Sequence, residues 1–450
     1  MTAVLLDPAP IRIAARASVL ERMLFGAGLF YAAVVFCLPV PYSEEVALVY
    51  PWWAQRIAIG NVQLYELLLL AWMVLYGAPF LARVFLTGGI PTRQAAVWLA
   101  MLAVWCGVMS LMAPLAFTDL GRTLRLFLCA ALLPAVVRWT RQSGNFPLTM
   151  LIFGFFTGSV INLVFSFRNP LIVLETMRLS GQNTPGVAMG IAIHLGAWLF
   201  LRSRSRLLHV LIVIATLTFT FGCAISYSRI GWFAGGLGLL SWAYVLFVAR
   251  PHDRAERRHL RKARRLWVPL LMAGLLALAS SPLAVEGLGW MQALLEQKFG
   301  SESTSGQGDR DRASYFIGVG EILMRYPAGV GYSGFLDAMR ATDIYHSGQA
   351  NEEFSYEANP HSAFLYYASA GGIPGAVFIV AVFVMLMNSM RVGLHMGLGR
   401  TGQALFALIA PAYLLIGLTV PYLVNSIVLI VPAAIAAGWG WSRRVQQATT

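Results

Sequence analysis

The sequence predicts an all-α, polytopic membrane protein with about twelve transmembrane helices and a large extracytoplasmic loop. The chain of 450 residues is 58% hydrophobic and only 12% charged, whereas about a quarter of the residues in a typical soluble domain are charged. Apolar runs of about 20 residues, the length that crosses a hydrocarbon core, recur from end to end. The runs are continuous rather than alternating, which excludes a transmembrane β-barrel.

Each apolar run is expected to form one span. The first run lacks a clear signal-peptide cleavage site and is expected to be a retained span. The run at 361–390 is longer than a bilayer requires, which predicts a tilted helix or an extra helical turn outside the membrane. The predicted spans are 23–40, 62–86, 94–113, 121–138, 147–167, 184–201, 206–225, 229–249, 267–284, 361–390, 401–420 and 422–441.

Basic residues predict the orientation of these spans. The connectors after the even-numbered spans are basic, and residues 250–265 carry eight basic against two acidic residues. Because cytoplasmic loops retain Lys and Arg, these connectors and both termini are expected in the cytoplasm. The net charge of +13 is therefore explained by topology, and no nucleic-acid partner is expected. A nucleic-acid or anionic-lipid site at 250–265 is the less favoured alternative.

The longest connector, residues 285–360, is expected on the outer face. It holds eleven of the twenty acidic residues in the chain and only five basic ones. Loops of this length between membrane helices are seldom simple connectors. Residues 313–326 have a helical pattern, and 301–309 are expected to be flexible. The predicted organisation is spans one to nine with short loops in 1–284, a periplasmic loop subdomain in 285–360, and the last three spans with a cytoplasmic tail in 361–450.

A few arginines are expected on the outer face, where positive charge is unusual. For each of them, an ion pair with an acid or a reach toward lipid headgroups is the structural alternative. The planar guanidinium group matches phosphate oxygens and keeps its charge near a membrane. A cluster of such arginines therefore predicts an anionic lipid ligand, a lipid phosphate or diphosphate. The arginines concerned include Arg122, Arg125, Arg178, Arg229 and Arg312.

Other local patterns are weak. GVGYSG at 329–334 fits a dinucleotide-binding pattern but lacks the strand and helix that such a motif needs, so its glycines are expected to serve a tight turn. No ligand spacing supports a metal site between His346 and His361. All four cysteines lie inside apolar runs, so no disulfide framework is predicted.

Three separate segments of the chain, taken together, match the sequence motifs of a known protein family. They are SYSRIG (226–231), DRDRASYFIGVGEILMRYPAGVGYSGF (309–335) and NPHSAFLYYASAGGIPGAVF (359–378). In this order, on the outer face of a twelve-span protein, they resemble the O-antigen ligase and polymerase superfamily. RLSGQNTPGVAMG (178–190) is similar to the arginine-containing segment that the family carries before its sixth span.

The family motifs map onto individual residues of this chain. Ser228 and Arg229 match its serine-arginine turn, Arg312 and 327–335 match its arginine followed by P-x-G-V-G-x-x-x-F, and His361 matches its histidine. Gly372 and Gly375 end the aromatic and apolar run that follows the histidine. Ser362 departs from the pattern, because relatives often have asparagine there.

The resemblance implies a glycosyltransferase of lipopolysaccharide biosynthesis in the bacterial inner membrane. Ligases of this superfamily move a glycan from an undecaprenyl diphosphate carrier to the lipid A-core acceptor at the periplasmic face, by an inverting reaction without a metal or other cofactor. Membrane lipids are the other expected partners. The alternatives are a polymerase or a protein O-oligosaccharyltransferase of the same superfamily and, from a different class, a secondary transporter.

The residue roles follow from the same resemblance and from the chemistry of the side chains. His361 is expected to be the general base, because a neutral imidazole can take the proton of an attacking hydroxyl. Arg229 and Arg312 are expected to stabilise the diphosphate leaving group. Arg178 is expected to be a weaker third arginine in this role, and Arg122 and Arg125 are expected to contact phosphates of the donor or the acceptor.

Overall fold

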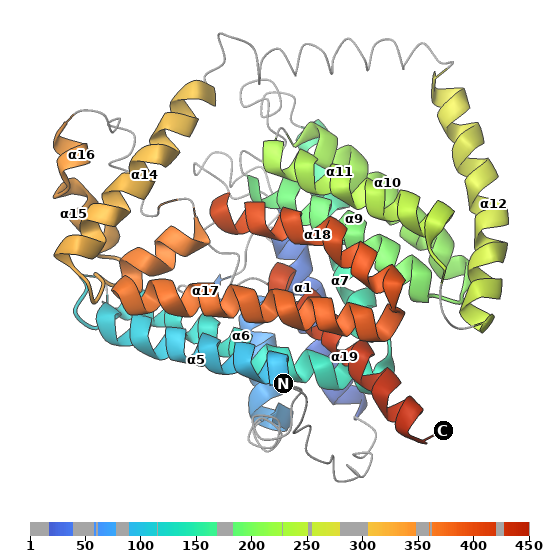
Figure 1. The fold of residues 1–450 in the computed structure, drawn as a ribbon, viewed down its shortest axis with the longest axis horizontal. Coiled ribbons are helices and arrows are strands. Elements are labelled where there is room, and N and C mark those ends of the chain that lie inside the picture. The colour runs from blue at the N-terminus through green and yellow to red at the C-terminus, as the bar shows by residue number, and fades with distance from the viewer. Residues whose placement is uncertain are drawn as a thin grey trace.

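The structure is a computed structural model of the chain, and it describes part of the sequence. The described residues are 18–38, 58–59, 62–77, 90–114, 116–168, 183–226, 228–250, 254–279, 305–347, 360, 362–419 and 427–449. Figure 1 shows that these residues form a bundle of helices. In chain order the elements are α1 (Val19–Cys37), β1 (Ala58–Ile59), β2 (Val62–Gln63), α3 (Leu64–Trp72), the π-helix η1 (Met73–Gly77), α5 (Ile90–Ser110), α6 (Ala116–Ser143), α7 (Phe146–Arg168), α9 (Asn183–Arg202), α10 (Arg206–Ile225), α11 (Arg229–Ala243), the π-helix η2 (Tyr244–Val248), α12 (Arg254–Ala279), α14 (Ser305–Arg325), α15 (Phe335–Arg340), α16 (Asp343–His346), α17 (Ala363–Leu398), α18 (Arg400–Thr419) and α19 (Ile427–Thr449).

The helical membrane class is confirmed. Within the described residues, nine helices are long and apolar enough to cross a membrane. They coincide with nine of the predicted spans and are α1, α5, α6, α7, α9, α10, α11 continued by η2, α17 and α18. The predicted spans at 62–86 and 422–441 coincide with shorter apolar helices, Leu64–Tyr76 and Leu429–Ser442. The predicted span at 267–284 falls partly on α12 and partly outside the described residues, so the count of twelve stays a prediction.

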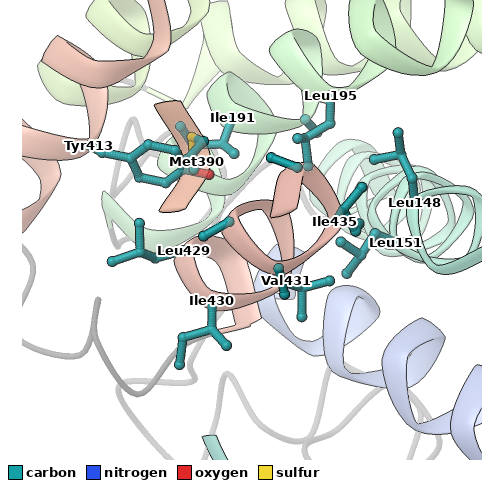
Figure 2. Packing of buried hydrophobic residues seen from close by; sticks show 14 of the residues in the cluster. Leu148, Leu151, Ile191, Leu195, Met390, Tyr413, Leu429, Ile430, Val431 and Ile435 are labelled. Carbon is teal, nitrogen blue, oxygen red and sulfur yellow. The ribbon is translucent and has the colours of Figure 1, made fainter. Parts of the chain in front are cut away.

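The core of the bundle lies where α17, α18 and α19 meet α7 and α9. Helix α9 is the most enclosed of the candidate spans, with 94% of its apolar window buried. Figure 2 shows Ile435 of α19 packed among Leu195 of α9 and Leu148 and Leu151 of α7. An all-round apolar helix such as α9 is expected at the centre, because it has no polar face to present outward.

Two contacts show how the ends of the helices are arranged. At the start of α5, Thr92 lies 2.8 Å from the Ser389 hydroxyl near the end of α17. At the end of α5, Trp105 donates a 2.7 Å hydrogen bond to the carbonyl of Gly371 near the start of α17. The two helices are therefore antiparallel, as alternating spans must be.

The basic connectors accordingly gather at one end of the bundle, which we call the basic end. Trp439 of α19 contacts two of these connectors at this end. Arg202, the last residue of α9, lies over its ring at 5.4 Å, and Gly397, near the end of α17, packs against it. The first half of α12 is docked there too, since Arg264 donates 2.7 Å and 2.6 Å hydrogen bonds to the carbonyls of Val245 and Ala249. The opposite end carries Arg122 and Arg229 and is called the site end. The assignment of the two ends to membrane sides stays a prediction.

Two expectations fall on segments that the structure describes in part. Residues 305–309 form the start of α14, and 301–304 lie outside the described residues, so the flexibility of 301–309 stays a prediction. Helix α17 breaks at Gly372, where φ is 63° and ψ is −152°, and Figure 1 shows its two parts pointing in different directions. Its tilt, or an extra turn outside the membrane, stays a prediction. Helix α14 folds over α15 and α16 and packs against the first part of α17.

The described part of the large loop has its own small core. Tyr315, Val319 and Ile322 of α14 pack against Phe335 and Met339 of α15. Residues 305–347 of the predicted loop 285–360 are therefore folded, and of its other residues the structure describes only residue 360. The division of the chain into 1–284, 285–360 and 361–450 stays a prediction.

Candidate functional site

Residues 327–334, here called the glycine loop, pack into the break of α17. The loop follows α14 directly and approaches α17 backbone to backbone. Three backbone hydrogen bonds join them: Val330 N to Ser369 O and Gly331 N to Ala370 O, each 3.0 Å, and Ile373 N to Pro327 O, 2.9 Å. Amides and carbonyls freed by the break of the helix thus find partners in the loop.

Glycine is required at this junction on both sides. Gly329 and Gly331 have φ of 101° and 72°, and Gly372 has φ of 63°, a region that other residues seldom adopt. A Cβ at Gly372 would collide with the carbonyl oxygen of Pro327, and one at Gly329 with the carbonyl oxygen of Ala370. The expectation that the glycines of 329–334 serve a tight turn is confirmed.

Asp119 fixes the glycine loop to α6. Its carboxylate is fully buried and accepts hydrogen bonds from Ser333 N at 2.9 Å and Ser333 Oγ at 2.8 Å. The same carboxylate is paired with the guanidinium of Arg122 at 3.4 Å. Tyr332 N donates a 3.4 Å hydrogen bond to Ser110 Oγ at the end of α5. The loop is therefore held by α17, α6 and α5 together.

Arg122, Arg125, Tyr332 and Tyr366 form an arginine-tyrosine cluster beside the loop. The guanidinium of Arg122, with its side chain 26% exposed, lies 6.0 Å from the centre of the Tyr332 ring. Tyr332 stacks on Tyr366 with ring centres 5.5 Å apart. Arg125 is paired with Glu66 of α3 and lies within electrostatic range of Tyr366. Both arginines thus have acidic partners, and both keep about a quarter of the side chain exposed, 26% for Arg122 and 27% for Arg125.

The environment keeps the Tyr332 phenol protonated. Burial, and then the neighbouring Cys106, Tyr367 and Tyr366, raise its pKa well above the ordinary range. Burial raises a phenol pKa because it disfavours the charged phenolate. The cluster therefore keeps its positive charge on the arginines, with neutral aromatic rings beside them.

Arg229 occupies a different part of the site end, at the junction of α9, α10 and α11. It is the half-buried first residue of α11, directly after Ser228, whose hydroxyl caps the helix by accepting a 3.0 Å hydrogen bond from Gly231 N. Gly186 of α9 packs against Ser226 and Gly231 so closely that a Cβ on it would collide with the Ser226 hydroxyl. The N-terminal dipole of α11 adds to the positive charge of the arginine.

The described residues do not join Arg229 to the arginine-tyrosine cluster directly. Helix α11 packs on α18, α18 on α17, and α17 on α5, which also packs on α6. Figure 1 shows α11, α18, α17 and α5 in this order. Helix α18 therefore lies between α11, which carries Arg229, and α17, whose Tyr366 belongs to the cluster.

The remaining predicted residues are only partly placed. Arg178 and His361 lie outside the described residues, and so does the side chain of Arg312, although its backbone belongs to α14. Ser362 caps α17 by accepting a hydrogen bond from Leu365 N, and it donates one of 3.4 Å to the carbonyl of Gly417 in α18. Serine and asparagine are both favoured at this capping position, so the departure from the family pattern at 362 preserves the cap.

Asp119, Ser333 and the two tyrosines were missed by the sequence analysis. Asp119 precedes Arg122 by three residues, a spacing at which side chains on a helix meet, so this ion pair could have been found. Ser333 is 214 positions from Asp119, and nothing in the local sequence connects them. The site therefore contains a buried acid that the outer arginines alone did not reveal.

Replacing Asp119 by Ala is expected to destabilise the chain by about 1–3 kcal/mol, the cost of leaving buried donors without an acceptor. Asp119→Asn should cost less, because its amide oxygen still accepts from Ser333. The shift in thermal unfolding of the purified protein measures both effects. Asp337→Ala is the matched control, because Asp337 is 67% exposed in a surface ion pair. Equal shifts for Asp119→Ala and Asp337→Ala would show that Asp119 does not anchor the loop.

Comparison with known proteins adds one finding. A protein-family model described as O-antigen ligase matches residues 214–380. The matched segment begins within α10 and ends in the second part of α17, so it contains Arg229, Arg312, the glycine loop and His361. Arg122, Arg125 and Arg178 precede it. None of the curated proteins matches the chain.

Proposed function

Because the chain belongs to the O-antigen ligase superfamily, we propose that it transfers O-antigen polysaccharide from undecaprenyl diphosphate to the lipid A-core oligosaccharide. The family implies a lipid-linked glycan and a lipid acceptor in general terms. One structural observation supports the more specific reaction. The matched segment holds the Ser228 and Arg229 turn, the glycine loop and the start of α17, and all three lie at the site end.

The proposed reaction is a displacement at the anomeric carbon of the donor. A hydroxyl of the acceptor sugar attacks this carbon from the face opposite the diphosphate, and its proton passes to the imidazole of His361. The bond from the anomeric carbon to the diphosphate oxygen breaks, and undecaprenyl diphosphate leaves with the bonding electrons. Attack from the opposite face inverts the configuration at the anomeric carbon. A histidine suits this step because its ordinary pKa of about 6.5 leaves it mostly neutral at neutral pH.

Arginines are proposed to stabilise the leaving group. The diphosphate gains negative charge as its bond breaks, and guanidinium groups can meet that charge with paired hydrogen bonds. Arg229 and Arg312 are assigned this role, with Arg178 as a weaker third. The position of Arg229 at the start of α11 supports this assignment, because the helix dipole also favours an anion there.

Arg122 and Arg125 are proposed to contact phosphates of the donor or the acceptor. Both are suited to this because 26% of the Arg122 side chain and 27% of the Arg125 side chain are exposed, with Arg122 beside Tyr332. Each is also paired with an acid, Asp119 for Arg122 and Glu66 for Arg125.

We place the site at the periplasmic face of the inner membrane, with both termini in the cytoplasm. The gathering of basic connectors at the opposite end supports this orientation.

Lipopolysaccharide from a deletion strain distinguishes the ligase from its relatives. Loss of a ligase should abolish capped lipopolysaccharide, while polymer still accumulates on the undecaprenyl carrier. Gel electrophoresis of lipopolysaccharide and a blot of the lipid-linked polymer measure the two pools, and a plasmid copy of the gene is the control. Lipopolysaccharide bearing single-unit caps would contradict the proposal and indicate a polymerase. Unchanged lipopolysaccharide with a missing protein glycan would indicate a protein O-oligosaccharyltransferase.

A further inference from the structure

Helix α14 exposes large apolar side chains on the side away from its own core. Phe316 and Ile317 are 50% and 55% exposed, and Met324 is 79% exposed. Ile317 and Met324 are seven positions apart, about two helical turns, so they share a face of the helix, and Phe316 lies within about 100° of Ile317 on the same side. Phe316, Ile317 and Met324 are called the α14 apolar face. Contiguous apolar surface of this kind marks a contact with a membrane or a partner.

The α14 apolar face continues a surface that already belongs to the membrane. Ile373 and Val377 are each 54% exposed on α17, which is a candidate span. Exposed apolar side chains on a span face the lipid. Ile373 N binds the carbonyl of Pro327 at 2.9 Å, and Pro327 follows Met324 by three residues. The lipid-facing surface of α17 therefore runs on to the end of α14.

The turn between α5 and α6 gives a second observation at the same level. Leu111 and Met112 are 72% and 87% exposed there, just beyond the end of α5. Gly331 of the glycine loop packs against Ala113 in this turn. Large apolar side chains exposed beside a span are covered when they lie in the headgroup and acyl boundary of the leaflet. The glycine loop and the end of α14 thus lie where the chain exposes apolar residues to the bilayer.

We propose that the α14 apolar face lies in the bilayer leaflet at the site end, so that α14 is an interfacial helix and not part of a water-exposed cap. The opposite face of α14 carries Tyr315, Val319 and Ile322, which pack on α15 and on the first part of α17. The lipid chains of the leaflet, rather than a protein partner, cover the face.

The placement does not depend on the proposed reaction, but it agrees with it. Arg312 lies one helical turn before Phe316 on α14. An interfacial α14 therefore holds this turn of the helix at the level of the headgroups, where the phosphates of a lipid-linked substrate lie. The prediction concerns membrane contact alone, so it can fail while the transfer reaction stands, and the reverse also holds.

Quenching of a site-specific label tests the placement in the full chain. Ile317→Cys carries a fluorophore on the apolar face, and Asp337→Cys on α15 is the control, because Asp337 is 67% exposed and paired only at the surface. The four native cysteines are buried and free. The protein is placed in single-copy nanodiscs that contain lipids with a quencher on the acyl chain. Lipid quenching should be several-fold stronger at 317 than at 337, and a water-soluble quencher should show the opposite order.

Three results would overturn the proposal. Strong quenching of both labels by the water-soluble quencher would place α14 in solvent. Protection of the 317 label from both quenchers would mean that another part of the chain covers the face. Lipid quenching at 317 that appears only when a nanodisc holds two copies would indicate a dimer interface. Met324→Cys repeats the measurement at the other end of the face, in case Ile317→Cys fails to fold.

Discussion

Replacing His361 by Ala is expected to lower glycan transfer by about 10²- to 10⁴-fold, the usual contribution of a positioned general base. Alanine cannot accept the proton of the acceptor hydroxyl, so attack on the anomeric carbon must proceed without a base. The helix start should survive the change, because Ser362 supplies the cap of α17 and binds Gly417 of α18. Transfer in membranes that contain equal amounts of each variant measures the loss.

His346→Ala is the matched control for this experiment. His346 is an exposed histidine at the end of α16, in the described part of the large loop. It should leave transfer near the wild-type rate. The pH dependence gives a second readout, because a base must be unprotonated. The wild-type rate should fall at acid pH, where an imidazole base is protonated, and the residual rate of His361→Ala should not. Near-normal transfer by His361→Ala would refute the assignment of the base.

The second large effect is expected at Gly372. Alanine there meets two penalties: about 1–3 kcal/mol for a side chain held at a φ that favours glycine, and about 1–3 kcal/mol for crowding. The crowding arises because the new Cβ would collide with the carbonyl of Pro327. The expected total is about 2–6 kcal/mol, seen as a lower temperature of thermal unfolding. The glycine loop should also become accessible to proteases, because its seat on α17 is displaced.

Gly320→Ala on α14 controls for the general effect of adding a methyl group. No atom lies within 4 Å of the Cβ that it would add, so alanine there should be neutral or should stabilise the helix by about 0.5–1 kcal/mol. The two substitutions therefore have expected effects of opposite sign. Equal unfolding temperatures for Gly372→Ala and Gly320→Ala would show that the glycine loop does not depend on the break in α17.

Most of the membrane-spanning architecture could be predicted from the sequence. Hydropathy alone identified the nine spans, because burial in lipid imposes a long apolar run on each helix. The break in α17 was not predicted, although Gly372 was noted as part of a motif. A helix break in a membrane is stable only when its freed backbone groups find partners. Here the partners come from 327–331, which no local pattern connects to α17.

The candidate site was predicted in outline and not in its contacts. The motif segments around Arg229, Arg312 and His361 were named from their order, and the family match spans all three. The long-range contacts were beyond sequence reasoning, because Asp119 and Ser333 meet only once α6 and the glycine loop are folded. The acidic partners of Arg122 and Arg125 decide how much of each charge remains for a ligand. The spacing of Asp119 and Arg122 already allows the first pair, whereas Glu66 is 59 positions from Arg125 and became evident as its partner only in three dimensions.

Reconstituted transfer tests the central claim most directly. The purified chain is placed in proteoliposomes with a defined undecaprenyl diphosphate glycan and a lipid A-core acceptor, in a buffer that contains a metal chelator. The account predicts glycan on the lipid A-core, with inverted anomeric configuration and one undecaprenyl diphosphate released for each glycan transferred. Growth of the carrier-linked glycan with an unmodified lipid A-core, or no transfer by the folded protein, would contradict it.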